Sequence, residues 1–278
     1  MPENSKHCKL CLSLNLQPSY QGSYKLFSCC NCGLNFIDDP GKYLDDDWFD
    51  DYFKRRQNDD SDNKLLTELR EEQYKIDSKF VSKYLKDNDS VLDIGCSNGK
   101  FLSIISGLKK NLNCIGIDID NFAISEANNN FGKSATYYCH DLISFKAKQN
   151  FDLVIFRGTL QYLGDTLLQS LDRLKEILKD QGVIIIFSLP STDSFMYHLL
   201  GHKWSLFHPE MQLMFNESSV RFLAQKYSYK IKSIDYPYLE DVYANPKNDF
   251  KNIKEIILGN SQKSNPFWGS IMRVILTN

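Results

Sequence analysis

The 278-residue sequence has no long apolar segment, no excess of basic charge and no secretion signal, and each absence excludes a class of protein. The longest aliphatic and aromatic run, Val183–Phe187, is far too short to span a bilayer. A formal net charge of −2 lacks the basic footprint that nucleic-acid-binding proteins usually carry. The first seven residues are polar and unlike a signal peptide. We therefore expect a cytoplasmic protein whose partners include neither a membrane nor a nucleic acid.

The composition is that of a protein with a substantial core. Hydrophobic residues make up 42% of the chain and aromatic residues 13%, and the length suits one large domain with a small one. Eight cysteines in a chain without a secretion signal favour a reducing compartment. We therefore expect these cysteines to be metal ligands or core residues and not disulfides.

Two cysteine pairs near the beginning have the spacing of a four-cysteine zinc site. Cys8 and Cys11 form one C-x-x-C pair, and Cys29 and Cys32 form the second pair 17 residues later. A segment this short cannot bury enough apolar surface by itself, so zinc would stabilise its fold. We expect a zinc-ribbon-like module over residues 1–37 with a structural metal ion, and Cys30 fits the spacing less well than Cys29.

An acidic connector follows over residues 38–63. Residues 38–62 contain ten Asp against four Lys or Arg, a local balance of −6. A solvated linker with a short helix around residues 48–53 is the favoured interpretation, and an acidic docking surface is the alternative. An amphipathic helix is then expected over residues 64–86.

Strands and helices alternate through the rest of the chain, which we assign to one domain over residues 64–278. This alternation predicts an α/β fold of the Rossmann-like type, with a seven-stranded, mostly parallel sheet and helices on both faces. Insertions are expected over residues 191–215 and 237–268. The expected strands lie near 90–94, 113–118, 135–140, 151–157, 182–188, 229–236 and 271–277, and the expected helices near 99–109, 121–131, 165–179 and 216–227.

The most informative motif is a glycine loop between two strands that each end in an acid. Asp93 closes the first strand, Gly95 and Gly99 allow a sharp turn close to a ligand, and Asp118 ends the next strand. An acid at the position of Asp118 is suited to bind two ribose hydroxyls. No third glycine follows Gly99 at the required spacing, so the loop is not the dinucleotide fingerprint that holds a pyrophosphate.

The pattern D-x-G-C-x-x-G with a ribose acid resembles motifs I and II of class I S-adenosylmethionine-dependent methyltransferases. The resemblance covers about residues 75–278 and implies S-adenosylmethionine as cofactor. The loop would contact its methionine end, Asp118 its ribose, and the residues after the second and third strands its adenine. The strand that begins at Phe151 resembles motif IV, and its end would face the sulfonium. The implied cofactor-binding residues are Asp93, Gly95, Cys96, Ser97, Gly99, Asp118, Ile119, Phe122, Asp141, Leu142, Phe156 and Arg157.

Three side chains are candidates to face the methyl acceptor. Many relatives have Glu-His after motif IV where this chain has Gln161-Tyr162, so Tyr162 is either an acceptor-positioning residue or a packing residue at a helix start. His208 and His202 lie in the 191–215 insertion, which in this fold often covers the acceptor. Imidazole titrates near neutral pH and could act as a general base.

A four-cysteine module ahead of such a domain resembles bacterial methyltransferases that act on sugars and other small biosynthetic metabolites. The resemblance implies a small-molecule acceptor, with a sugar or a sugar nucleotide among the candidates. The alternatives are a zinc-bearing ribosomal RNA base methyltransferase and a cofactor-binding protein without catalysis. The sequence leaves open whether O, N or C is methylated, and it leaves the oligomeric state open.

Overall fold

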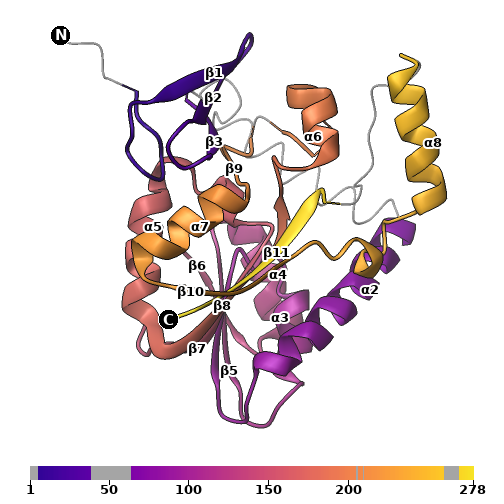
Figure 1. Cartoon of the computed structure of the whole chain (residues 1–278). Coiled ribbons are helices and arrows are strands. Elements are labelled where there is room, and N and C mark those ends of the chain that lie inside the picture. The colour runs from indigo at the N-terminus through magenta and orange to yellow at the C-terminus, as the bar shows by residue number, and fades with distance from the viewer. Residues whose placement is uncertain (1–5, 39–63, 205, 209, 260–268) are drawn as a thin grey trace.

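A computed structural model describes residues 6–38, 64–204, 206–208, 210–259 and 269–278 (Figure 1). Its main feature is a seven-stranded sheet in the order β10-β11-β8-β7-β4-β5-β6. The ladders from β8 to β6 are parallel, and only β11 runs opposite to its neighbours. The predicted α/β fold with a seven-stranded, mostly parallel sheet is therefore confirmed. The strands are β4 (Ser90–Ile94), β5 (Asn113–Asp118), β6 (Thr136–Cys139), β7 (Phe151–Arg157), β8 (Leu178–Pro190), β10 (Lys230–Asp235) and β11 (Ile271–Thr277).

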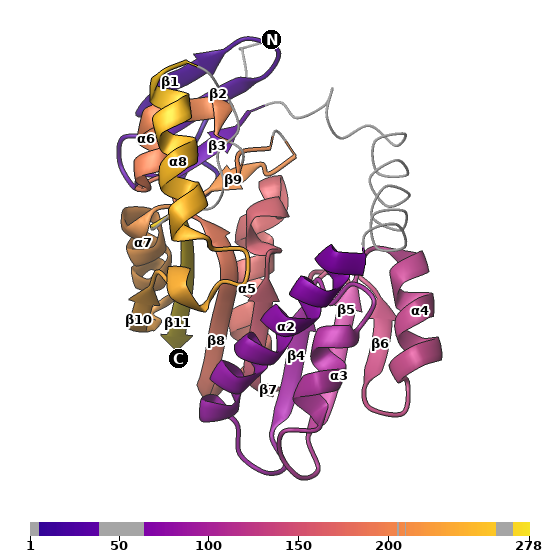
Figure 2. The ribbon, with the colours of Figure 1, turned by 90° about the vertical axis from the view of Figure 1, so that its right-hand side faces the viewer.

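Helices cover both faces of this sheet because its central strands are apolar on both sides. Along β7, Leu153 and Ile155 pack toward α2, α3 and α4, whereas Val154 and Phe156 pack toward α5 and α7. Figure 2 shows α2, α3 and α4 together on one side. The helices are α2 (Lys64–Val81), which η1 (Ser82–Tyr84) continues, α3 (Lys100–Ser106), α4 (Asn121–Phe131), α5 (Leu167–Ile177) and α7 (Glu217–Tyr227).

The N-terminal segment forms a second, four-stranded sheet that a distant part of the chain completes. Its order is β1 (Leu16–Gln21), β2 (Lys25–Cys29), β3 (Asn35–Ile37) and β9 (Leu213–Met214). Strand β9 comes from the 191–215 insertion, and it pairs antiparallel with β3 through Phe36 and Leu213. The Ile37 amide also donates to the Gln212 carbonyl at 3.0 Å. The expected module thus shares its sheet with the insertion, at the end of the main sheet where β8 leads into α6 (Figures 1 and 2).

Most aromatic residues of the 191–215 insertion form a core with the N-terminal sheet. Trp204 and Phe207 are buried against Tyr24 and Leu26, and α6 (Phe195–Leu200) adds Met196 to this cluster. Helix α8 (Pro246–Ile257) packs on the same cluster and lies in the predicted 237–268 insertion. Neither short helix was predicted from the sequence. The short helix expected around residues 48–53 lies outside the described residues, as does nearly all of the acidic connector.

Candidate cofactor-binding site and cysteine cluster

The glycine loop between β4 and α3 has the backbone conformation that its sequence predicts. Gly95 and Gly99 both have φ +76°, a region that residues with a Cβ avoid. A Cβ on Gly95 would lie 2.2 Å from Oγ1 of Thr159, and a Cβ on Gly99 would lie 2.7 Å from the Tyr137 ring. The loop therefore passes close to two other elements, and only glycine fits at either position.

Hydrogen bonds tie this loop to the end of β5. The Asp118 carboxylate accepts from the Ser97 amide at 2.8 Å and from the Asp120 amide at 3.0 Å. The Ile117 carbonyl accepts from the amides of Gly95 and Cys96. Asp118, which we predicted to bind the ribose, therefore also fixes the glycine loop, which we predicted to contact the methionine end of the cofactor. The two motifs form one rigid site because each holds the other.

A cavity of about 270 Å³ opens beside the loop, where β4, β5, β6 and β7 end. Polar and apolar groups from four strand ends meet there, as expected at the carboxyl edge of a parallel sheet. Gly99, Phe122 and Phe156 do not line it, and Phe122 is 50% exposed. The predicted residues that line the cavity are Asp93, Gly95, Cys96, Ser97, Asp118, Ile119, Asp141, Leu142, Arg157 and Tyr162.

Asp93 is a buried carboxyl group that lines this cavity. The residue is 2% exposed, and its Oδ1 atom has no hydrogen-bond partner among the described residues. Burial raises the pKa of Asp93 to about 7, the Arg157 charge opposes this shift, and the Asp118 charge adds to it. A cationic group of a ligand placed near Asp93 would favour its ionised form. Asp141, by contrast, accepts from the Ser144 amide at 2.6 Å, and this hydrogen bond lowers its pKa.

Arg157 is held by residues of α2 that the sequence did not single out. Its Nε donates to Asp77 at 2.9 Å, and Asp77 is buried. The guanidinium carbon lies 4.5 Å from the centre of the Tyr74 ring, which also lines the cavity. No local motif marks Asp77 or Tyr74, because both sit on the apolar side of an ordinary amphipathic helix. Only the packing of α2 on the sheet brings them to the site.

The structure brings Tyr162 to the cavity but neither of the two histidines. Tyr162 ends η2 (Leu160–Tyr162) just after β7, and it is one of the residues that line the cavity. His202 stacks on Tyr20 of the N-terminal sheet, with ring centres 4.0 Å apart. His208 is exposed and is not a lining residue. The insertion instead contributes Glu210 and Gln212, which lie within three residues of the beginning of β9.

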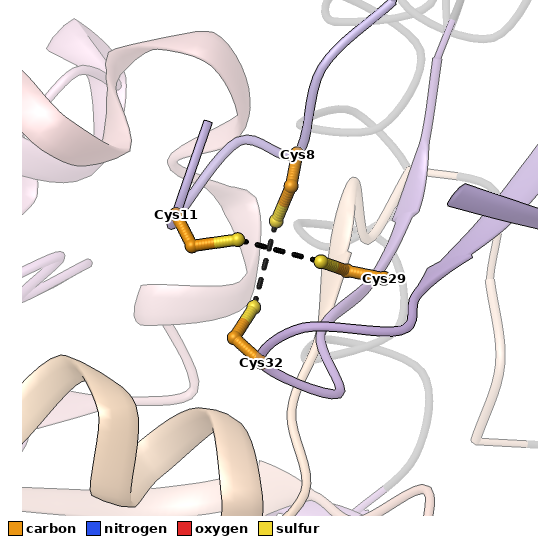
Figure 3. Close-up of side chains that lie close together, drawn as sticks. All are labelled: Cys8, Cys11, Cys29 and Cys32. Atoms are coloured by element: carbon orange, nitrogen blue, oxygen red, sulfur yellow. Dashed lines mark hydrogen bonds between the residues drawn. The ribbon is translucent and has the colours of Figure 1, made fainter. Parts of the chain in front are cut away.

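The four predicted zinc ligands converge in the N-terminal sheet (Figure 3). Their Sγ atoms all lie within 4.8 Å of one another, with 3.5 Å between Cys8 and Cys32 and 3.4 Å between Cys11 and Cys29. Tetrahedral zinc with bonds of about 2.3 Å would need sulfur atoms about 3.8 Å apart, so the arrangement fits that ion. Cys30 is exposed and outside the cluster. The preference for Cys29 over Cys30 therefore agrees with the geometry.

The turn around each cysteine pair has the features of a metal-binding knuckle. The Leu10 amide points at the Cys8 sulfur from 3.5 Å, and Gly33 after the second pair has φ +79°. The hydrogen bond from Cys32 lowers the pKa of Cys8 to about 5, whereas burial raises the pKa of Cys29 to about 11. Burial therefore opposes ionisation of Cys29, and a bound zinc ion would favour the thiolate form of its ligands.

A glycine loop and an acid at successive strand ends define the class of α/β proteins that bind a nucleoside-bearing cofactor at the carboxyl edge of the sheet. Within that class, a family described as a methyltransferase domain matches residues 66–234, more than half of the chain. The protein belongs to this family.

Curated relatives match about 40% of the chain. An uncharacterized protein of Methanocaldococcus jannaschii is 30% identical over 110 residues, which cover 40% of this chain and 41% of that protein. The ribosomal protein L11 methyltransferase of Thermosipho africanus is 30% identical over 118 residues, covering 40% of this chain and 42% of that enzyme. The chain thus spans less than half the length of the curated relatives it matches.

Solved structures of methyltransferases share the fold. The plantazolicin methyltransferase BpumL, solved with a triazolic desmethylPZN analog and SAH, has a TM-score of 0.54 at 21% identity and covers 83% of this chain and 93% of its own. A TehB-like SAM-dependent methyltransferase from Corynebacterium glutamicum has a TM-score of 0.50 at 14% identity, covering 82% and 97%. Among the described residues, no helix is long and apolar enough to cross a membrane.

The raised pKa of Asp93 predicts that this residue's contribution to the stability of the protein falls as the pH rises. Between its ordinary pKa near 4 in the unfolded chain and about 7 in the folded protein, the folded state keeps a proton that the unfolded state releases. The free energy of unfolding should therefore decrease across this interval, and Asp93→Asn should remove part of that slope. Urea denaturation from pH 4.5 to 8 measures it, with the exposed Asp180→Asn as control. Equal slopes in wild type and Asp93→Asn would contradict the assignment.

Proposed function

We propose that the protein transfers a methyl group from S-adenosylmethionine to a small, hydroxylated biosynthetic metabolite. The observation that carries the proposal is the hydrogen-bonded unit of the Gly95–Gly99 loop and Asp118, which opens onto a cavity in a chain of the methyltransferase domain family. When bound, the cofactor supplies an electrophilic methyl group on a sulfonium. The protein has to hold that group, exclude water and align the acceptor with it.

The lining residues suit the three parts of this cofactor. Asp118 lines the cavity at the end of β5, and because each oxygen of a carboxylate can accept more than one hydrogen bond, its side chain suits a pair of ribose hydroxyls. The buried Asp93 suits the ammonium of the methionine end, directly or through water. Ile119 and Leu142 offer apolar contact to the adenine, and Asp141 can accept from its amino group.

Tyr162 is the predicted residue best placed to contact the acceptor. It lines the cavity after β7, next to Thr159 and Leu163. A phenol of pKa about 10 is a weak base, so its role is to orient the acceptor through a hydrogen bond. The positions of His202 and His208 do not support the catalytic roles expected for them, because neither lines the cavity.

We infer that the cysteine cluster binds one structural zinc ion. All four ligand positions are filled by Cys8, Cys11, Cys29 and Cys32, which leaves none for a substrate. The metal would hold β2 and β3 together, and β3 pairs with β9 directly after Gln212 of the cavity wall. The ion would thereby act on the cavity through backbone pairing and would take no part in the chemistry.

Asp118→Asn should weaken S-adenosylmethionine binding. Loss of the charged acceptor for the ribose hydroxyls should reduce binding by roughly 1.5–3 kcal/mol, about tenfold to more than a hundredfold in Kd. Isothermal titration calorimetry measures it, and Asp180→Asn serves as a matched control far from the loop. Equal affinities in Asp118→Asn and wild type would show that Asp118 does not hold the cofactor.

Tyr162→Phe should lower kcat for the true acceptor by about tenfold, the loss expected when a hydrogen bond that orients a reactant is removed. The Kd of S-adenosylmethionine should stay unchanged. The acceptor is first identified by mass spectrometry after incubating metabolite fractions and RNA with labelled cofactor. Tyr138→Phe, an exposed tyrosine outside the cavity, is the control. An unchanged kcat would reject the role of Tyr162, and methyl transfer to RNA would reject the small-molecule acceptor.

Protein purified without chelators should contain one zinc per chain, and Cys8→Ser should lose it while Cys30→Ser keeps it. Metal loss should also lower the thermal stability of the chain, because the small N-terminal sheet depends on the ion. Elemental analysis and thermal denaturation measure both effects. Absence of stoichiometric metal in the wild type would contradict the assignment, and metal loss in Cys30→Ser alone would show that Cys30 is the ligand.

A further inference from the structure

A second cavity of about 240 Å³ shares Arg157 with the cofactor-binding cavity. It lies between α2, the ends of β7 and β8, the beginning of β11 and the segment over residues 237–243. None of the site residues predicted from the sequence lines it except Arg157. An apolar cavity of about 150 Å³ is enough to bind benzene, so this cavity has room for a substituted six-membered ring.

The charged side chains of its wall are paired with one another or with neighbouring residues. Arg157 donates from Nε to Asp77 at 2.9 Å, and Gln73 donates to the same carboxylate at 2.9 Å. Arg273 donates to Glu240 at 2.7 Å. A sugar ring would have to bury several hydroxyls against groups that already have partners, which is unfavourable.

The rest of the wall is mostly apolar and aromatic. Phe187 comes from β8, Ile271 from β11 and Leu206 from the 191–215 insertion, while Pro237 and Tyr243 come from the segment that follows β10. Tyr243 is 39% exposed, so its ring can contact a ligand without being removed from a core. Ring faces and edges attract another aromatic ring by contacts that an aliphatic ring of the same shape lacks.

Arg157 is a polar group of this wall that can still donate hydrogen bonds. Its Nη atoms have no hydrogen-bond partner among the described residues, and they are not sealed from solvent, since the side chain is 19% exposed. The guanidinium carbon lies 4.5 Å from the centre of the Tyr74 ring and 5.5 Å from that of Phe101, which helps to hold it in place. Because Arg157 lines both cavities, an oxygen bound by Nη would lie where the two cavities meet.

We propose that the second cavity binds the aromatic ring of a phenolic acceptor, with Arg157 donating from Nη to the hydroxyl oxygen that receives the methyl group. The proposal rests on the proposed function and names an acceptor class other than a sugar. In the transfer, the hydroxyl proton leaves to water and the phenolic oxygen bonds to the methyl carbon. The electron pair of the broken C–S bond stays on sulfur, which gives S-adenosylhomocysteine.

A phenol also suits the catalytic groups that the cavities offer. The pKa of a phenol is about 10, far below that of a sugar hydroxyl, and a hydrogen bond donated to its oxygen favours the deprotonated form. Such an acceptor therefore depends less on a strong general base. This agrees with the positions of His202 and His208, neither of which lines either cavity.

Charged rings fit the same wall less well. Asp241 accepts from the Tyr243 amide at 2.8 Å, and burial raises the pKa of Asp241. A carboxylate on the ring would face Asp241 and Asp77, and an ammonium would face Arg157 and Arg273. Since acids and bases alternate around the cavity, an uncharged ring is the favoured occupant.

The test compares ligands of similar shape that differ in aromaticity or charge. Protein saturated with S-adenosylhomocysteine is titrated with phenol and cyclohexanol, with catechol and cyclohexane-1,2-diol, and with glucose, benzoate and benzylamine. Saturation-transfer NMR reports binding. We expect the aromatic member of each of the two pairs to bind about three- to tenfold more tightly than its alicyclic partner, and the sugar and the charged rings to bind more weakly than phenol.

Two variants locate the binding. Arg157→Lys keeps the charge beside Asp77 but removes the Nη donors, so it should weaken phenol about tenfold and leave toluene, which has no hydroxyl, unchanged. Tyr243→Ala should weaken both ligands about three- to tenfold. The matched controls Arg221→Lys and Tyr138→Ala alter exposed residues outside both cavities and should bind like wild type.

Several outcomes would overturn the proposal. They are equal binding of the aromatic and alicyclic members, tighter binding of glucose or a charged ring than of phenol, and unchanged phenol binding in Arg157→Lys or in Tyr243→Ala. Urea denaturation checks that the variants are folded. Calorimetry with S-adenosylhomocysteine separates the two levels. If the wild type binds this product but no phenol, only the acceptor class fails, whereas a protein that does not bind it refutes the proposed function itself.

Discussion

The parallel strands β4, β5 and β7 are buried on both faces, and most of the site follows from this constraint. Inside the sheet, the backbone N–H and C=O groups pair between strands and most side chains are apolar. Polar side chains therefore gather where the strands end. The hydrogen bond from the Ser97 amide to Asp118 joins two of these ends. It fixes the glycine loop relative to the neighbouring strand, and the cavity forms in the space that this pair encloses.

The N-terminal sheet and the cavity are joined by direct structural contacts. Strand β9 completes the sheet that carries the cysteine cluster, and the residues just before it, Glu210 and Gln212, line the cavity. A second link is the ion pair of Lys9 with Asp165 at 3.0 Å, in which the Lys9 side chain is 7% exposed. Asp165 follows Tyr162 by three residues. The knuckle that carries Cys8 and Cys11 therefore packs directly against the segment that positions the proposed acceptor contact.

Local patterns in the sequence predicted much of the main sheet and many of the residues that line the cavity at its strand ends. The strands at β4, β5 and β7 were expected within a residue of their observed ends, because each is a short apolar run bounded by turn residues. Helices α6 and α8 were not predicted. Helix α6 is only six residues long, too short for a periodic pattern to be seen. Helix α8 does carry apolar residues at helical spacing, Phe250, Ile253 and Ile257, and this pattern went unrecognised in the predicted 237–268 insertion. Strand β9 has two residues, too few for any period to be seen.

The sequence by itself determined the conformation of the glycine loop and which four cysteines come together. Their functional groups sit within short, regularly spaced segments, and positive φ angles at Gly95 and Gly99 are readable from residue type. Only the tertiary structure decided which remaining side chains join them. Asp77, Arg157, Asp241 and Arg273 are far apart in the chain, and the packing of α2 and of the 237–243 segment on the sheet brings them together. Such long-range contacts depend on the fit of whole elements, which leaves no periodic signal in the residues concerned.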